Sequence, residues 1–78
     1  MKINIEQEGN TKIVHVSGDL IHTHVPTFKK NMEPLWTEEV YAVIFNFQKV
    51  ASNDAAGICE LILISRQFNA ARIRMALC

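Results

Sequence analysis

The sequence predicts an α/β fold, in which a mixed four-stranded sheet has helices packed against it in the order β-β-α-β-α-β. Three patterns support this prediction. Apolar and polar residues alternate near both ends of the chain, a nearly continuous apolar run covers residues 41–47, and two stretches carry apolar residues at helical spacing. A chain of 78 residues, 49% of them hydrophobic, has room for one domain, which we expect to span residues 1–78.

A hairpin is expected to open the sheet. Residues 2–8 alternate between apolar and polar side chains, which is the period of a half-buried strand. The Gly-Asn pair at positions 9 and 10 supplies a turn that tolerates positive φ. Residues 11–17 alternate again as the partner strand, and Gly18 is expected to end it.

Residues 25–36 predict an amphipathic helix, because their apolar side chains recur along one stripe. The stripe comprises Val25, Phe28, Met32, Leu35 and Trp36. Thr23 is expected to cap the start of this helix. Pro34 lacks a backbone N–H and costs ~3 kcal/mol inside a helix, so we expect the helix to kink or stop near Glu33.

Residues 41–47 predict the central strand, either covered on both faces or flanked by pairing strands, because they are apolar without alternation. Three potential capping residues at 52–54 then precede a long helix over residues 55–68. One face of that helix is predicted to carry Ile58, Leu61, Ile62, Ser65 and Phe68. Asn69 is expected to end it in a left-handed conformation.

Residues 72–78 alternate once more and predict the last strand, with Ile73, Met75 and Leu77 on one side. No helix follows this strand, so one flank of the sheet is expected to be bare. We therefore expect either a homodimer or a domain truncated at its C-terminus.

The composition argues against several kinds of partner. Eight basic residues balance eight acidic ones, so no net field attracts nucleic acid. No stretch reaches the ~18 apolar residues that span a bilayer, so we expect no direct membrane insertion. Cys59 and Cys78 show neither disulfide-framework nor zinc-ligand spacing, which indicates a cytoplasmic location.

We expect no enzyme activity, no cofactor and no metal. The serines and Cys59 lack a nucleophile motif with a local histidine, and no glycine-rich phosphate loop is present. The spacing of His22 and His24, near His15, would suit a metal ion. Because Asp19 is the only acidic residue beside them, surface or strand-end histidines are the preferred interpretation.

The junction at residues 52–58 is the candidate functional site. It places a capping carboxylate, two small residues and a glycine where a helix begins after the central strand. Small side chains leave a helix N-terminus open to another surface. From composition alone, a plain N-cap followed by helix-compatible alanines is the preferred interpretation, and a docking surface is the alternative.

Four segments in order resemble the STAS domain family, in particular the bacterial anti-sigma factor antagonists. They are the hairpin ending in Gly18-Asp19-Leu20, the helix reaching Trp36, the strand 43–47, and the junction Asp54-Ala55-Ala56-Gly57-Ile58. The resemblance covers almost the whole chain. It implies the STAS fold, usually with a further helix after the fourth strand, and a role in signal transduction and transcription regulation.

In that family the junction commonly reads Asp-Ser-Ser-Gly-Leu, and the Ser or Thr before the glycine is phosphorylated by a kinase that is also the anti-sigma factor. The resemblance places Asp54 and Gly57 on the family's aspartate and glycine, and Ala56 on the phosphoacceptor, whose hydroxyl is lost here. Phosphorylation would add about −1.5 to −2 charges at that position. Ile21 stands where many relatives carry an aspartate, and Ser52, the nearest hydroxyl, is interpreted as a cap or turn residue.

Two functions follow from the resemblance. The leading hypothesis is a module that docks on an anti-sigma factor or kinase-type regulator through Ser52, Asn53, Asp54, Ala55, Ala56, Gly57 and Ile58, with Gly18, Asp19 and His22 beside them. The alternative is a structural subunit of a larger assembly, such as a signalling particle or a lipid-transport complex. The bare sheet flank, Cys59 and Leu63 favour this alternative.

Overall fold

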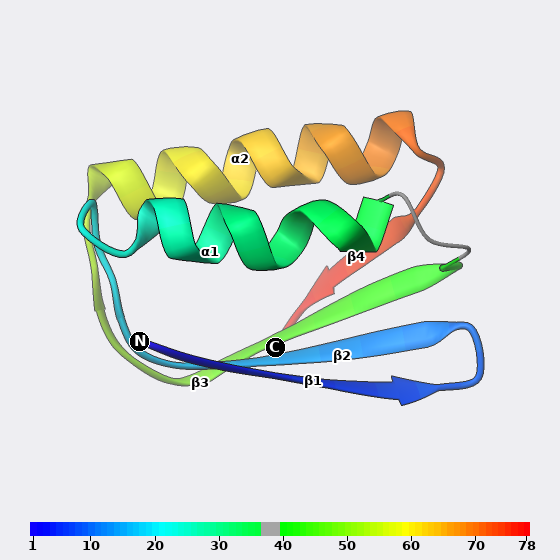
Figure 1. Ribbon diagram of the computed structural model, residues 1–78, viewed down its shortest axis with the longest axis horizontal. Coiled ribbons are helices and arrows are strands. Elements are labelled where there is room, and N and C mark those ends of the chain that lie inside the picture. Colours follow the sequence, from blue (N-terminus) through cyan, green and yellow to red (C-terminus); the bar gives the residue numbers. More distant parts are fainter. Residues whose placement is uncertain (37–39) are drawn as a thin grey trace.

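The computed structural model describes residues 1–36 and 40–78, and it contains one mixed sheet with helices on one side (Figure 1). The strands are β1 (Lys2–Glu8), β2 (Thr11–Leu20), β3 (Ala42–Asn53) and β4 (Arg74–Leu77). The helices are α1 (Val25–Met32), the 3-10 helix η1 (Glu33–Trp36) and α2 (Ala55–Ala70). The strand order is β1-β2-β3-β4, with β1 antiparallel to β2 and the other pairs parallel. The predicted α/β architecture and element order are confirmed.

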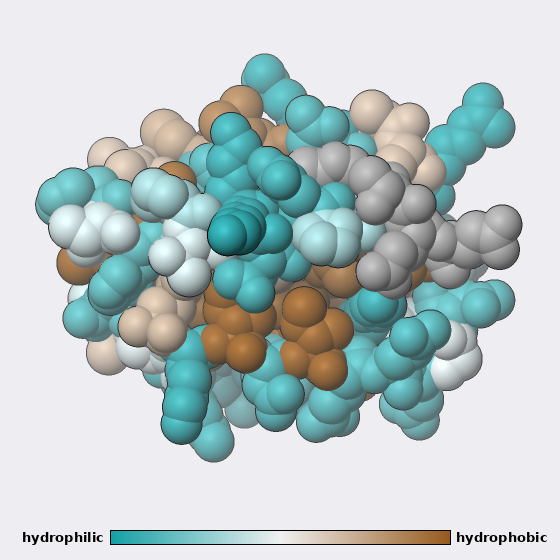
Figure 2. All heavy atoms as spheres, in the orientation of Figure 1, coloured by the Kyte–Doolittle hydropathy of each residue, from teal (hydrophilic) through white to brown (hydrophobic). Residues whose placement is uncertain are grey.

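The core lies between the sheet and the two helices, because each strand turns alternate side chains toward them. Phe45 on β3 contacts Phe28 of α1 and Phe68 of α2, with ring centroids 6.2 and 6.0 Å apart. Figure 2 shows hydrophobic atoms gathered between α1 and the strands, surrounded by hydrophilic residues. The buried hydrophobic residues are Val14, Val16, Leu20, Phe28, Met32, Leu35, Val40, Val43, Phe45, Ile64, Phe68 and Ile73.

The second strand does not end at Gly18, so that prediction is wrong. β2 continues to Leu20, and its pairing with β3 shifts register between Gly18 and Asp19. Gly18 adopts φ 93, and the sheet absorbs this conformation as an irregularity instead of ending there. β3 is correspondingly longer than predicted and runs to Asn53, where it pairs with Leu20.

The first helix stops at Met32 and tightens into η1, as the proline at position 34 predicts. The prediction that Thr23 caps this helix is wrong. The N-cap is His24, and its side chain makes no capping hydrogen bond. Backbone hydrogen bonds close the turn before the helix instead. The N–H groups of His24 and Val25 both donate to the Ile21 carbonyl, at 2.8 and 3.2 Å. The side chain of Trp36 lies outside the described residues.

The central strand is flanked by β2 and β4, while the helices cover only one of its faces (Figure 1). The apolar run of this strand predicted either cover on both faces or pairing strands on both sides, and the second alternative is correct. Val43 and Phe45 are fully buried on the helix side, whereas Ile44 is half-buried on the opposite face. That opposite face is called the bare face below.

The buried side of α2 differs from the predicted one. Its buried residues are Gly57, Glu60, Ile64 and Phe68. Ile58 and Ile62, predicted to face the same way as Phe68, are 48% and 51% exposed. Because apolar residues surround most of this helix, its sequence contains no unique stripe, and the position of its first turn on the sheet decides which side is buried.

The end of α2 and the last strand also differ slightly from expectation. Asn69 remains helical, the helix ends at Ala70, and the left-handed residue is Arg72 at φ 61. β4 is shorter than predicted and lies at the edge of the sheet. Leu77 is 59% exposed there, so the predicted apolar side of this strand is only partly covered.

Candidate functional site

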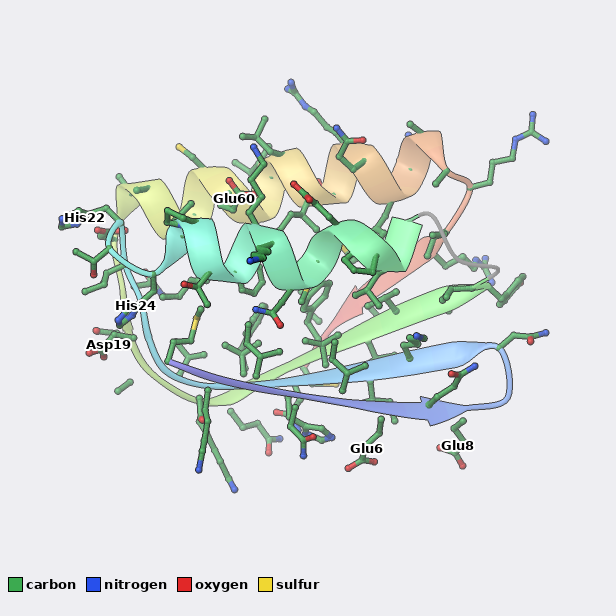
Figure 3. The ribbon with its side chains drawn as sticks, viewed as in Figure 1. Glu6, Glu8, Asp19, His22, His24 and Glu60 are labelled. Atoms are coloured by element: carbon green, nitrogen blue, oxygen red, sulfur yellow. The ribbon has the colours of Figure 1, made fainter. Side chains whose placement is uncertain are left out.

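The candidate site forms where β2 and β3 end side by side. Because these strands are parallel, their carboxyl ends meet at the same edge of the sheet, and Asp19 pairs with Ser52 in the register. The following segments begin α1 and α2. Figure 3 shows Asp19, His22 and His24 together at this end of the molecule, beside the starts of both helices.

Asp54 holds the two segments together. It is the N-cap of α2, and its Oδ1 accepts a hydrogen bond from the Gly57 backbone N–H at 2.9 Å. Its Oδ2 accepts from the His22 backbone N–H at 2.9 Å and lies 3.1 Å from the His22 Nδ1. The hydrogen bonds from Gly57 and then His22 stabilise the ionised carboxylate and lower the pKa of Asp54 below its ordinary value of 3.8.

A second set of contacts centres on Asp19. The Ser52 hydroxyl donates to Asp19 Oδ1 at 2.7 Å. The backbone carbonyl of Asp19 lies 2.7 Å from His24 Nδ1, so the residue before α1 is tied back to the end of β2. These contacts fix the connection between β2 and α1 against the start of α2.

Gly57 allows the close approach of α2 to β2. It is buried, and a Cβ placed on it would lie 2.2 Å from the Leu20 carbonyl oxygen. A side chain of any size would collide with this backbone atom. Gly57 therefore lets the start of α2 lie against β2, and its contact with a partner stays a prediction.

Eight of the other predicted residues form one accessible region, called the junction surface here. Ser52, Asn53, Ala55, Ile58 and His22 are exposed, whereas Ala56, Asp54 and Asp19 are half-buried. Gly18 belongs to β2, where it pairs with Val50 and lies beside Met1. The junction surface combines two carboxylates, a histidine and small or apolar side chains around one helix start.

Sequence reasoning missed the contact made by His24 and the burial of Glu60. His24 acts through a backbone carbonyl across a loop, and Glu60 is 6% exposed on a helix otherwise rich in apolar residues. Neither feature leaves a spacing pattern in the sequence. Only the packing of α1 and α2 over the sheet reveals them.

In residues 1–36 and 40–78, no three His, Cys, Asp or Glu side chains gather closely enough to hold a metal ion. The Ser52 hydroxyl is directed to a carboxylate and not to a histidine, and both cysteines are exposed. Within the same residues, no helix has the length and apolar character needed to cross a membrane.

The profile of the STAS domain matches residues 2–78 of this sequence. The chain belongs to the STAS domain family. Among curated proteins, none matches the sequence.

Solved structures show that the STAS fold of this chain occurs in proteins of different size. The anti-sigma factor antagonist SpoIIAA in its unphosphorylated form superposes with a TM-score of 0.79 at 20% identity, over 97% of this chain and 71% of that one. SpoIIAA of Bacillus in its phosphorylated form has a TM-score of 0.76 at 20% identity, over 95% and 68%.

Two larger proteins contain the same fold. A crystal structure of Mglu gives a TM-score of 0.85 at 20% identity, over 95% of this chain but only 18% of Mglu. The murine anion transporter Slc26a9 gives a TM-score of 0.79 at 19% identity, over 92% of this chain and 12% of the transporter. This chain thus spans 18% of Mglu and 12% of Slc26a9, but 71% of the unphosphorylated SpoIIAA chain.

Proposed function

We propose that this STAS domain is a protein-interaction module that resembles an anti-sigma factor antagonist and docks on an anti-sigma factor or related regulator in the cytoplasm. The observation that carries the proposal is the junction surface, where Asp54 binds His22 and caps α2 at once. A surface fixed by such contacts needs little ordering when it binds, which favours affinity. Nucleic acid and the membrane interior are not among the proposed partners.

The proposed module lacks the phosphorylation switch that the family resemblance implies. Ala56 occupies the phosphoacceptor position, and it is half-buried in the first turn of α2, two residues from the Asp54 carboxylate. A phosphate there would add about −1.5 to −2 charges near that carboxylate. With a methyl group instead, position 56 has no hydroxyl to carry a phosphate.

Ser52 does not replace the missing hydroxyl in this proposal. Its Oγ already donates to the Asp19 carboxylate at 2.7 Å, and Asp54 follows two positions later. A phosphoserine between these carboxylates would meet like charges on both sides. Ser52 instead fixes the ends of β2 and β3 to each other.

A binding experiment with the anti-sigma factor that SpoIIAA antagonises, and with anti-sigma factors of the chain's own organism, tests the proposal. We expect the wild-type domain to bind at least one of them, with no phosphate incorporated in the presence of ATP. Ala55→Arg places a long charged side chain on the exposed first turn and should weaken binding by about tenfold or more. Ala70 is also exposed and lies at the other end of α2, so Ala70→Arg is the matched control and should bind normally.

Two results would contradict the proposal. Phosphate transferred stoichiometrically to the wild-type domain would show that a switch exists. Equal loss of binding in Ala55→Arg and Ala70→Arg would place the contact elsewhere.

A further variant restores the hydroxyl. Ala56→Ser should fold and become a phosphoacceptor for a kinase that binds the domain.

A structural subunit of a larger assembly is the second candidate. Leu63 on α2 is 52% exposed, and Cys59 is exposed one turn before it on the same side of the helix. Mglu and Slc26a9 show that a domain of this fold occurs within much longer chains. Pull-down from a lysate separates the candidates, because an ATPase-fold regulator supports the first and a membrane-transport complex supports the second.

A further inference from the structure

The bare face of the sheet carries two adjacent rows of polar side chains that the junction surface does not use. In the first row, Ser17 on β2 pairs with Lys2 on β1 and with Lys49 on β3. In the second row, His15 pairs with Asn4 and Asn46 on the same two neighbours. Cross-strand partners on one face have their Cβ atoms about 5 Å apart, so the two rows form one polar patch.

A bulge in β3 brings an additional side chain to this patch. His15 pairs with Asn46, but Ser17 pairs with Lys49, so β3 contains one more residue than β2 between the two rows. Such a bulge redirects a side chain that would otherwise alternate to the opposite face. Gln48 and Lys49 therefore both line a hollow of about 190 Å³ on the bare face, although they are consecutive.

The hollow is positively charged. Its lining includes two lysines and no carboxylate. Within the described residues, neither Lys2 nor Lys49 forms an ion pair. The carboxylate of Glu6 lies in the next row, where Figure 3 shows it pointing away from the helices. Its Oε1 is 3.4 Å from His15 Nε2, within ion-pair reach but without hydrogen-bond geometry.

The side chain of Asn46 presents its donor group to the hollow. The Gln48 backbone N–H donates to Asn46 Oδ1 at 3.0 Å, which fixes the orientation of the amide. The Asn46 Nδ2 group then lies 3.4 Å from His15 Nδ1 and keeps a second N–H unused. The lining of the hollow thus includes an amide, a hydroxyl and two lysines, contributed by three strands.

We propose that this hollow is a binding site for a phosphate group, either free phosphate or that of a small phosphomonoester. Lysine serves as a point-charge ligand for phosphate, and neutral Ser and Asn donors complete its hydrogen bonds. The volume of about 190 Å³ is below the ~300 Å³ of pockets for drug-sized ligands, so it fits a phosphate group better than a whole nucleotide. The site is independent of the junction surface, because it lies on the bare face.

Backbone amide NMR titrations with inorganic phosphate, and separately with glycerol 3-phosphate, test the proposal against sodium chloride at equal ionic strength. We expect shifts confined to residues lining the hollow, such as Ser17, Asn46 and Lys49, with a Kd of about 1 mM or tighter. Lys49→Gln should weaken binding about tenfold, since it removes a charge-assisted hydrogen bond. Lys29→Gln, an exposed lysine on α1, is the control and should leave the Kd unchanged.

Both the wild-type protein and the Lys49→Gln variant should give the same far-UV circular dichroism, because this side chain is exposed. Three outcomes would overturn the proposal: no phosphate-specific shifts, equal weakening by Lys29→Gln and Lys49→Gln, or shifts centred on the first turn of α2. Tighter binding of glycerol 3-phosphate than of phosphate would support the site and identify the phosphomonoester as its ligand.

Discussion

Replacing Gly57 by alanine tests how closely α2 approaches β2 beneath the junction surface. The new Cβ would lie 2.2 Å from the Leu20 carbonyl oxygen and 3.0 Å from the Leu20 carbonyl carbon. Ordinary van der Waals contact begins near 3.4 Å, so the oxygen must move away by about 1.2 Å. That oxygen also accepts the backbone N–H of Asp54, at 3.4 Å, and the movement therefore disturbs the start of α2.

Two opposing terms set the size of the effect. Alanine is favoured over glycine within a helix by about 1 kcal/mol. Overpacking costs about 1–3 kcal/mol, and here the upper end applies because the colliding atom belongs to the backbone and cannot change rotamer. The net loss in unfolding free energy is about 2 kcal/mol, which corresponds to a fall in Tm of about 8–16 °C for a domain of this size.

Urea unfolding followed by circular dichroism measures this loss. Ala55→Gly is the matched control, because it reports the alanine-to-glycine preference in the same turn at an exposed position. We expect Ala55→Gly to lose at most about 1 kcal/mol. If Gly57→Ala is instead as stable as the wild-type protein or more so, the close contact with Leu20 does not limit this position and the reasoning is wrong.

Three further predictions concern the cap, the core and the left-handed residue. Because folding lowers the Asp54 pKa, the Asp54 carboxylate stabilises the fold at pH values above its ordinary pKa of 3.8. This stabilisation is lost as the pH falls through the lower pKa of the folded state. In urea titrations across this acidic range, the unfolding free energy of Asp54→Asn should therefore fall less steeply with pH than that of the wild-type protein. Phe45→Ala empties a fully buried ring position and should cost about 3–5 kcal/mol, enough to abolish near-UV circular dichroism at 25 °C. Arg72→Gly relieves a left-handed backbone at φ 61 and should raise Tm by a few degrees, equivalent to at most ~1 kcal/mol.

Each of these predictions has a contrary result. An unchanged acid dependence in Asp54→Asn would show that another carboxylate governs acid unfolding. A native near-UV spectrum for Phe45→Ala would mean that the rings of Phe28 and Phe68 close the gap, and a lower Tm for Arg72→Gly would mean that the arginine side chain itself stabilises the turn.

Local chemistry explains why much of the fold was predictable. The Gly-Asn turn, the chain-breaking proline at position 34 and the capping carboxylate of Asp54 act through their own backbone or the next few residues. The strand alternation is equally local. The four-stranded architecture follows once these elements are placed in order, because each apolar face must be buried against another element.

The candidate site was only partly predictable for the same reason. The sequence places Asp54 at a helix start, but its bonds to His22 cross 32 positions of the chain. The hydroxyl of Ser52 reaches Asp19 over 33 positions. No local pattern encodes such partners, which depend on the parallel pairing of β2 with β3.

By itself, the sequence determined the order of the elements, the cap of α2 and the end of α1, since each depends on near neighbours in the chain. Only the tertiary structure decided which side of α2 is buried, that β2 runs past Gly18, and that the bulge in β3 gathers two lysines on the bare face. The physical reason is that burial and strand register result from contacts between distant segments, which exist only after the chain has folded.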